Sequence, residues 1–192
     1  MAYDILQHHP FARFTLIGDG PLRSHLENLV ERLQTSWAVH FTGWACADDL
    51  PGLLAGIDIV VNPFLWPETF CIANIEVMSM GVPLVTFAVG GIGEYVHDPA
   101  LAHSYGGNMS RTAGRIASGP DSEGDFSVSD NAVMVNRATP IALARAALHL
   151  IRRPALRRYL GLNGRRTVLD HFKVERQMQE YGVLYDSLLK SQ

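Results

Sequence analysis

The sequence has few cysteines, no long apolar run and no excess of positive charge, and each absence excludes a class of protein. Two cysteines, Cys46 and Cys71, occur among 192 residues and form no spacing motif, so reduced thiols are expected, with a single disulfide as the open alternative. No apolar run approaches the roughly 20 residues needed to span a bilayer, so no transmembrane segment is predicted. The formal net charge of -3 gives no indication of a nucleic-acid binder.

The sequence also lacks the features of a secretion signal and of a metal site. Residues 1–5 have neither a basic region nor a long apolar core, which predicts a cytoplasmic protein. The eight histidines show no metal-ligand spacing, so they are expected to be solvated or packed, and no metal site is predicted.

What is present is a strand and helix alternation in a chain that is 47% hydrophobic, enough for one well-buried domain over residues 1–192. Strands are predicted at 11–17, 38–42, 57–62, 83–87 and 132–135, and helices at 22–33, 48–54, from 68 onward, from 140 and from 154. This order predicts an α/β fold: a Rossmann-like, doubly wound parallel sheet with helices on both faces. The strand at 57–62 is nearly all apolar and is expected to be buried on both faces.

Two segments near the C-terminus depart from this alternation. Residues 104–131 hold five glycines and six serines, which predicts a mobile insertion or long loop. A helical tail is predicted over about residues 140–190, since prolines stand where two helices begin. An apolar stripe marks its last helix: Val174, Met178, Tyr181, Tyr185 and Leu188.

The most informative feature is the carboxylate pair Glu68 and Glu76, placed between a predicted strand and an apolar helix. Open α/β sheets bind ligands at this kind of strand end. The N–H groups of residues 69–72 are predicted to open the helix and bind anionic oxygens. Glu76 could accept hydrogen bonds from two ribose hydroxyls. The alternative is that Glu68 caps the helix and Glu76 pairs with a nearby arginine.

Two glycine-containing turns and the tryptophans are weaker signals. The backbone of the Gly18–Pro21 turn could approach a nucleotide, or the segment could be an ordinary strand-to-helix turn. The dinucleotide-binding fingerprint is incomplete, because Arg23 stands where its third glycine belongs. The Gly90–Glu94 segment is either a second ligand-facing loop or a turn. Three aromatic side chains could stack on a base or sugar, with core packing favoured for the first: Trp37, Trp44 and Trp66.

Taken in order, a set of short motifs resembles the C-terminal, donor-binding domain of family-4 glycosyltransferases, which are retaining enzymes of the GT-B fold. The resemblance runs from about Phe11 to the C-terminus, and the two glutamates match the family's pair separated by seven residues. The motifs are Gly18-Asp19-Gly20-Pro21, Phe41-Thr42-Gly43, Asp49-Leu50-Pro51, Asn62-Pro63, Glu68-Thr69-Phe70, Glu76, Met80-Gly81-Val82-Pro83 and Gly90-Gly91-Ile92 with Glu94.

The resemblance implies roles for these residues around a nucleoside-diphosphate sugar, with no cofactor or metal. Glu68 is similar to the catalytic-site glutamate at the donor sugar, close to the transferring carbon, and Glu76 to the one that holds the ribose. The other residues implied to bind the donor are Phe70, Cys71 and Ile72 at sugar and phosphate, Gly43, Trp44 and Ala45 at the base, and Gly18 and Gly20 along the same cleft.

Two departures from the family limit what the resemblance implies. The family usually has glycine where this chain has Cys71. An N-terminal Rossmann domain that binds acceptor, and an Arg and a Lys that neutralise the pyrophosphate, are absent from this sequence.

The expected function is therefore the donor-binding half of a hexosyl-transferring enzyme, inactive alone and completed by a missing N-terminal domain or separate chain. Whether the chain is an enzyme stays open. The alternative is a non-catalytic nucleotide-sugar-binding or protein-interaction module derived from a glycosyltransferase. Self-association is a further expectation, because Tyr181, Tyr185 and Leu188 lack the cover that the absent domain supplies in the family.

Overall fold

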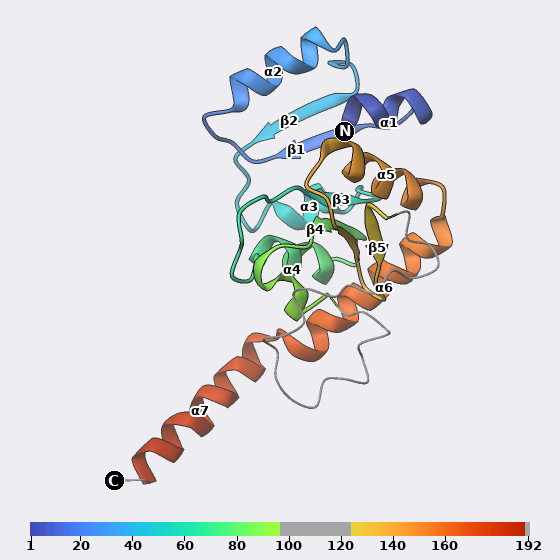
Figure 1. The fold of residues 1–192 in the computed structure, drawn as a ribbon. Coiled ribbons are helices and arrows are strands. Elements are labelled where there is room, and N and C mark those ends of the chain that lie inside the picture. The colour runs from blue at the N-terminus through green and yellow to red at the C-terminus, as the bar shows by residue number, and fades with distance from the viewer. Residues whose placement is uncertain (97–123, 191–192) are drawn as a thin grey trace.

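The computed structural model describes residues 1–96 and 124–190, which form an α/β fold (Figure 1). Most of the predicted strands and helices are present within a few residues of their expected bounds. In chain order the elements are α1 Ala2–His8, β1 Phe14–Ile17, α2 Arg23–Arg32, β2 Val39–Gly43, α3 Leu50–Leu54, β3 Val60–Asn62, α4 Ile72–Ser79, β4 Leu84–Phe87, η1 Gly90–Glu94, β5 Phe126–Val128, β6 Val133–Val135, α5 Pro140–Ile151, α6 Pro154–His171 and α7 Val174–Lys190.

The strands form two hydrogen-bonded ladders. Strands β1 and β2 pair in parallel, and a second ladder has the order β3-β4-β6-β5. Its first three strands are parallel, as predicted, whereas β5 runs antiparallel to β6. The antiparallel pairing follows from the tight turn between β5 and β6, where the Ser129 amide donates to the Ala132 carbonyl at 3.0 Å, because a short turn can only join antiparallel neighbours.

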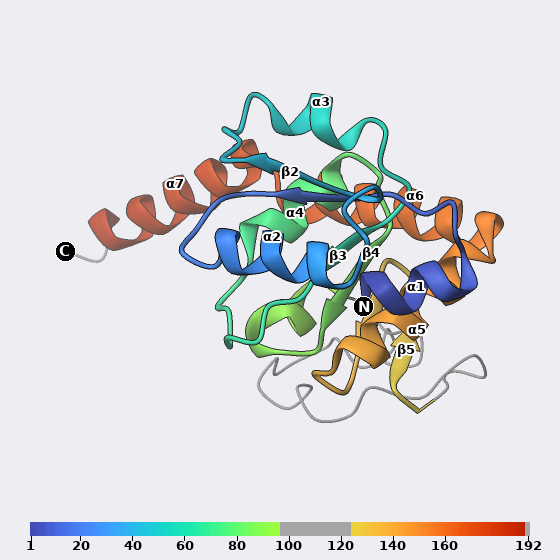
Figure 2. The ribbon, with the colours of Figure 1, turned by 90° about the horizontal axis from the view of Figure 1, so that it is seen from above.

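Helices cover both faces of the larger ladder, which confirms the doubly wound arrangement (Figure 2). Leu84 of β4 belongs to a buried cluster that includes Met78 of α4. Val85 and Phe87 of the same strand belong to a second cluster with Leu150 of α5. Successive side chains of a strand point to opposite faces, so β4 is buried on both.

Strand β3, in contrast, is only half-buried along its length, so the expectation that it is buried on both faces is wrong. It lies at the edge of the four-stranded ladder, with β4 as its one hydrogen-bonded neighbour there. An edge strand has less cover than a central one, and its apolar composition does not reveal its position in the sheet.

Three elements were not predicted: α1, β5 and the short 3₁₀ helix η1, which lies where a loop or a turn was expected. Strand β5 lies within the expected long loop, and Phe126 anchors it because its ring is completely buried. Residues 104–123 of that loop lie outside the described residues. Helix α1 places Ile5, 1% exposed, in a third cluster with Ala147 and Leu148 of α5.

The two C-terminal helices differ in packing. Helix α6 lies against α4, and a Cβ added at Gly161 would overlap the carbonyl oxygen of Gly81, so the glycine permits close contact. Helix α7 projects away from the body and has no buried residue (Figures 1 and 2). Its predicted apolar stripe is therefore exposed. In the described part of the chain, no helix is both long and apolar enough to cross a membrane.

Candidate functional site

The candidate site lies where several connecting segments meet at the carboxyl ends of the parallel strands. Ile17 at the end of β1, Leu50 of α3 and Val89 after β4 are partly buried against the cluster that contains Cys71 at the start of α4. The turn after β1, residues 43–45 after β2, the segment from Glu68 to Glu76 and the loop after β4 therefore gather around one end of the strands. This is the edge at which open α/β sheets bind ligands.

Helix α4 begins at Ile72, four residues later than expected from the sequence. Cys71 is the N-cap residue, and no side chain caps the helix. The N–H groups of Thr69 and Phe70 therefore precede the helix, and the prediction that they open it is wrong. The chain instead turns at Glu68, whose amide donates to the Trp66 carbonyl at 2.8 Å.

Phe70 anchors this pre-helix segment through its ring. The ring packs edge-on against Tyr95 and Phe172, with centroid distances of 5.4 and 5.2 Å. The side chain of Phe70 is thus directed into the protein, and Phe172 links the segment to the junction of α6 and α7.

The Glu68 side chain is half-buried and forms no hydrogen bond or ion pair with any described residue, so the alternative of a helix cap is wrong. Its backbone is held by the glycines after β4. The Gly91 amide donates to the Glu68 carbonyl at 2.8 Å. A Cβ added at Gly90 would overlap that same carbonyl oxygen, and one added at Gly91 would overlap the carbonyl oxygen of Thr69. The close approach that these glycines permit is therefore to the segment that carries Glu68.

Glu76 lies on the second turn of α4 and is also half-buried. Within residues 1–96 and 124–190, its carboxylate has no ion pair and no hydrogen bond. The alternative that an arginine neutralises it is wrong for this part of the chain. Both members of the carboxylate pair thus have acceptor oxygens that no described residue occupies.

A buried amide chain lies behind the first turn of α4. Asn62 Nδ2 donates to Asn74 Oδ1 at 2.6 Å, and Asn74 Nδ2 donates to the Tyr95 hydroxyl at 2.9 Å. Asn131 Nδ2 donates to the Tyr95 carbonyl at 2.7 Å. Burial, more than any other effect, raises the pKa of Tyr95 above its ordinary value. Asn62 was noted only as part of a motif, and Asn74, Tyr95 and Asn131 were missed, although an amide on a mostly apolar helix, Asn74, was a visible signal.

Cys71 adopts the left-handed backbone conformation, with φ 61° and ψ 78°. Its side chain is 7% exposed, and Asn62 Nδ2 donates to its Sγ at 3.6 Å. Burial raises the pKa of the thiol, and the charge of Glu68 acts in the same direction. Both cysteines are free, which excludes the disulfide. A glycine at this position would adopt the same conformation without strain.

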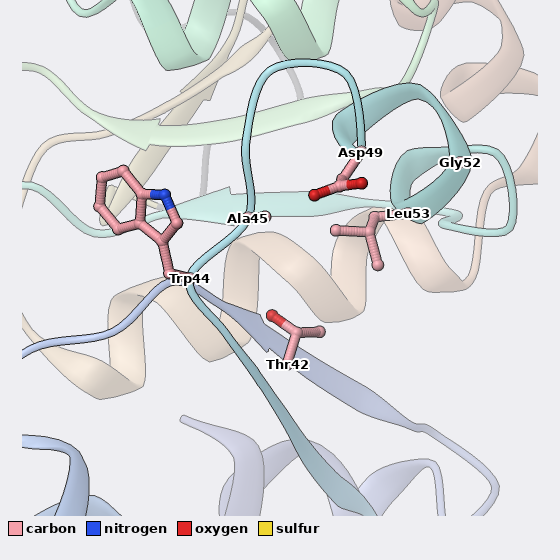
Figure 3. A pocket seen from close by; sticks show the side chains of 6 residues that line it. All are labelled: Thr42, Trp44, Ala45, Asp49, Gly52 and Leu53. Carbon is pink, nitrogen blue, oxygen red and sulfur yellow. The ribbon is translucent and has the colours of Figure 1, made fainter.

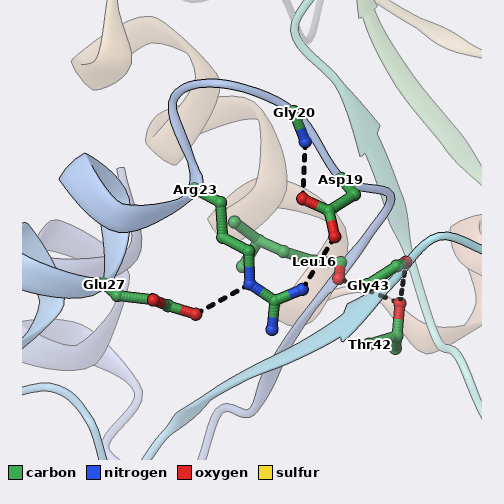
Figure 4. Close-up of polar contacts among 7 residues, drawn as sticks. All are labelled: Leu16, Asp19, Gly20, Arg23, Glu27, Thr42 and Gly43. Carbon is green, nitrogen blue, oxygen red and sulfur yellow. Dashed lines mark hydrogen bonds and ion pairs between the residues drawn. The ribbon is translucent and has the colours of Figure 1, made fainter.

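The turn after β1 is braced by charged side chains (Figure 4). Asp19 Oδ1 accepts from the Gly20 amide at 2.7 Å, and Arg23 donates to Asp19 at 3.1 Å and to Glu27 at 2.8 Å. The Gly18 amide donates to the Gly43 carbonyl at 2.9 Å, which joins the ends of β1 and β2. Arg23 is therefore neutralised by two carboxylates and is not left over for a phosphate.

A shallow pocket of about 370 Å³ lies beside residues 43–45 (Figure 3). Its lining residues are Thr42, Trp44, Ala45, Asp49, Gly52 and Leu53. Asp49 accepts from the thiol of Cys46 at 3.0 Å and from its amide at 3.2 Å, and these hydrogen bonds lower the pKa of Asp49. The Trp44 indole is 82% exposed, so it is free to contact a ligand.

The other two tryptophans are also at the surface. Trp37 is 58% exposed, with the Arg13 guanidinium 4.9 Å from its ring centroid, so the prediction of core packing for Trp37 is wrong. Trp66 is 74% exposed and lies two residues before Glu68.

The part of the chain described by the structure contains no group of three or more side chains that could hold a metal ion.

Comparison with known proteins relates the sequence to glycosyltransferases. A family model described as Glycosyl transferases group 1 matches residues 2–108. An uncharacterized glycosyltransferase of Methanocaldococcus jannaschii is 36% identical over 92 residues, which are 48% of this chain and 23% of that protein. N-acetyl-alpha-D-glucosaminyl L-malate synthase of Bacillus anthracis is 24% identical over 179 residues, 93% of this chain and 38% of that protein. The chain thus spans well under half the length of these relatives.

Solved structures show the same fold. Sucrose-phosphate synthase from Thermosynechococcus elongatus superposes with a TM-score of 0.73 at 24% identity, covering 100% of this chain and 42% of that one. Anabaena Alr3699/HepE in complex with UDP gives 0.71 at 21% identity, covering 96% and 44%. The C-terminal domain of a glycosyl transferase group 1 family protein from Francisella tularensis gives 0.66 at 20% identity, covering 90% and 76%. The fold is therefore that of the C-terminal half of a GT-B glycosyltransferase.

Proposed function

Because the chain belongs to the group 1 family of glycosyl transferases, we propose that it is the donor-binding half of a retaining glycosyltransferase. The reaction is transfer of a hexosyl group from a nucleoside-diphosphate sugar. The observation that carries the proposal is the pair Glu68 and Glu76, two half-buried carboxylates without a partner among the described residues, at the strand ends where this fold binds ligands. Complexes of Anabaena Alr3699/HepE with UDP and with UDP-glucose support the choice of ligand.

Each part of the site has a role in this proposal. Glu76 accepts hydrogen bonds from the ribose hydroxyls, and charge-assisted bonds of this kind contribute about 1.5–3 kcal/mol each. Glu68 lies at the donor sugar, close to the transferring carbon. The amide of Ile72 at the start of α4 faces the phosphate oxygens, where the helix dipole favours negative charge. Phe70 and Cys71 position this segment.

The remaining donor contacts come from the turns after β1 and β2. Gly18 and Gly20 line the cleft, and Gly43, Trp44 and Ala45 border the base beside the pocket. No metal or other cofactor enters the proposal, since the leaving diphosphate is to be stabilised by hydrogen bonds and cations.

Within the described segments that form this site, the cation Arg23 is already paired with Asp19 and Glu27, so it does not offer a free charge to the diphosphate. We therefore expect weak binding and no turnover by this chain, a single domain over residues 1–192. An N-terminal Rossmann domain, in the same or a separate chain, would supply an Arg, a Lys and the acceptor site.

The second candidate function is a non-catalytic module that binds a nucleotide-sugar or another protein. The neutralised Arg23 favours it, and so does Cys71, whose side chain stands at a position where backbone approach to a donor would be easiest for glycine.

Calorimetry with UDP, GDP and ADP sugars tests the first function against the second. Weak binding that Glu76→Ala abolishes, and that the exposed control Glu31→Ala leaves unchanged, would support a nucleotide-sugar cleft. Absence of binding by the unaltered chain would favour an interaction module. Addition of a complementary N-terminal domain with its Arg and Lys should restore turnover, and a chelator should not reduce it.

A further inference from the structure

Positive charge is concentrated in one short stretch of this acidic chain. Eight of the 16 basic residues but only two of the 19 acidic residues fall within residues 152–176. That stretch carries a formal charge of +6, and the remainder of the chain carries -9. Most of the stretch is helix α6, whose Leu160 belongs to the buried cluster with Leu150 of α5 and whose Val168 belongs to the one with Met78 of α4.

One face of α6 presents arginines and apolar side chains together to solvent. The spacing along the helix places Arg158, Tyr159, Leu162, Arg165, Arg166 and Leu169 on one side, here named the α6 outer face. Tyr159 is 52% exposed, Leu162 64% and Leu169 45%. The opposite side of the helix carries the buried residues Leu160, Gly164 and Val168. The outer face therefore cannot turn inward without breaking the core.

The arginines of this face remain available to an external anion. Arg158 has no ion pair or hydrogen bond with any described residue. Arg166 lies 3.5 Å from Asp170, but their side chains are 81% and 54% exposed, so the pair contributes little. Arg165 donates to the Ser79 carbonyl at 3.0 Å through one nitrogen and is otherwise exposed.

We propose that the α6 outer face binds the surface of an anionic lipid bilayer. Guanidinium groups pair with lipid phosphates, while leucine and tyrosine side chains enter the boundary between headgroups and acyl chains. The 18-residue helix is about 27 Å long, so it can lie along the surface. A nucleic acid would contact the arginines but would leave Leu162 and Leu169 in water, so the apolar side chains favour a bilayer.

This orientation leaves the nucleotide-sugar cleft accessible. Arg165 bonds to the last residue of α4, whereas Cys71 and Ile72 lie at the other end of that helix. A chain attached through α6 therefore has the carboxyl ends of its strands directed away from the surface.

Co-sedimentation of the whole chain with vesicles tests the proposal. Vesicles of phosphatidylcholine alone are compared with vesicles of phosphatidylcholine mixed with phosphatidylglycerol, at low and high salt. The chain is expected to bind the mixed vesicles and to be released by salt. The double variant Arg158→Gln, Arg166→Gln should bind roughly thirtyfold more weakly, since each basic residue near an anionic surface contributes about a fivefold factor.

The matched control is the double variant Arg32→Gln, Arg137→Gln. It has the same net charge as the test variant but alters exposed arginines outside the α6 outer face. This control should bind the mixed vesicles as tightly as the unaltered chain does. Leu162→Gln retains every arginine and should also weaken binding. Failure to bind the mixed vesicles, or equal loss of binding in the control, overturns the proposal. The proposal is also overturned if the chain binds a short DNA duplex or polyglutamate but does not bind vesicles. Circular dichroism verifies that each variant is folded.

Discussion

The backbone amide of Gly91 donates a hydrogen bond to the carbonyl oxygen of Glu68 at 2.8 Å. The loop after β4 therefore sets the position of the segment that carries the first carboxylate of the proposed donor site. No side chain could take the place of hydrogen at Gly90 or Gly91, because the backbone of residues 68 and 69 occupies that space. The glycines act on the site through the chain they contact.

Substitution of these glycines should therefore destabilise the protein. Gly91→Ala is expected to reduce the free energy of unfolding by about 1–3 kcal/mol, because an added methyl group forces the Glu68 segment to move. Urea denaturation measures the change. The control is Gly93→Ala in the same short helix, where an added Cβ meets nothing within 4 Å. Equal effects at Gly91 and Gly93 would contradict the assigned role of the Gly91 contact.

The left-handed conformation of Cys71 predicts an unusual order of stability. Cys71→Gly should be more stable than Cys71→Ala by about 1 kcal/mol, because alanine retains the steric cost of a positive φ and glycine does not. Thermal and urea unfolding of the two variants provide the comparison.

A control for the substitutions at Cys71 lies two residues further along the chain. Ala73→Gly, on the first turn of α4, should lower stability by up to about 1 kcal/mol, since glycine is unfavourable in a regular helix. If glycine were also the less stable residue at position 71, the backbone there would not be strained.

The buried side chain of Tyr95 should make the free energy of unfolding depend on pH in the alkaline range. Its folded-state pKa is raised, so the folded chain retains the phenolic proton after the unfolded chain has lost it. The stabilisation is complete below about pH 10, the ordinary tyrosine pKa, and is lost as the pH rises toward the folded-state value. Tyr95→Phe should lack this alkaline loss.

The same variant should be less stable at neutral pH by about 1–3 kcal/mol, because Asn74 Nδ2 loses its acceptor. The difference between the two proteins should therefore shrink above about pH 10. Urea unfolding over a pH series measures both effects, and Tyr185→Phe on exposed α7 serves as the control. Parallel pH profiles for the unaltered chain and Tyr95→Phe would refute the prediction.

Helix α7 predicts self-association without a contribution to folding. Its apolar side chains Tyr181, Tyr185 and Leu188 are 47%, 61% and 56% exposed, and the two tyrosine rings stack at 6.3 Å. Light scattering should show a mass that rises with concentration, and a variant ending at Lys173 should be monomeric.

The free energy of unfolding of that shortened variant should equal that of the full chain within about 0.5 kcal/mol, because α7 has no buried residue. A full chain that stays monomeric at every concentration would show that the exposed stripe does not drive association.

Most of the fold could be predicted because its elements depend on local patterns. Helix α5 begins at Pro140, as predicted, and Thr139 caps it by accepting from the Ala142 amide at 3.2 Å. Strand β5 was missed because three residues between serines and aspartates give too short a pattern, and its stability comes from pairing with β6 and from the burial of Phe126. The half-buried state of β3 likewise depends on its place in the sheet.

By itself the sequence determined the class of fold, the order of its elements and the two glutamates that relate the chain to its family. These follow from periodicity, capping and short motifs, which act between near neighbours in the chain. Only the tertiary structure decided that α4 begins at Ile72, that Cys71 is left-handed and that Gly91 holds Glu68. Those features depend on contacts between segments far apart in the sequence, where packing and hydrogen bonding override local preference.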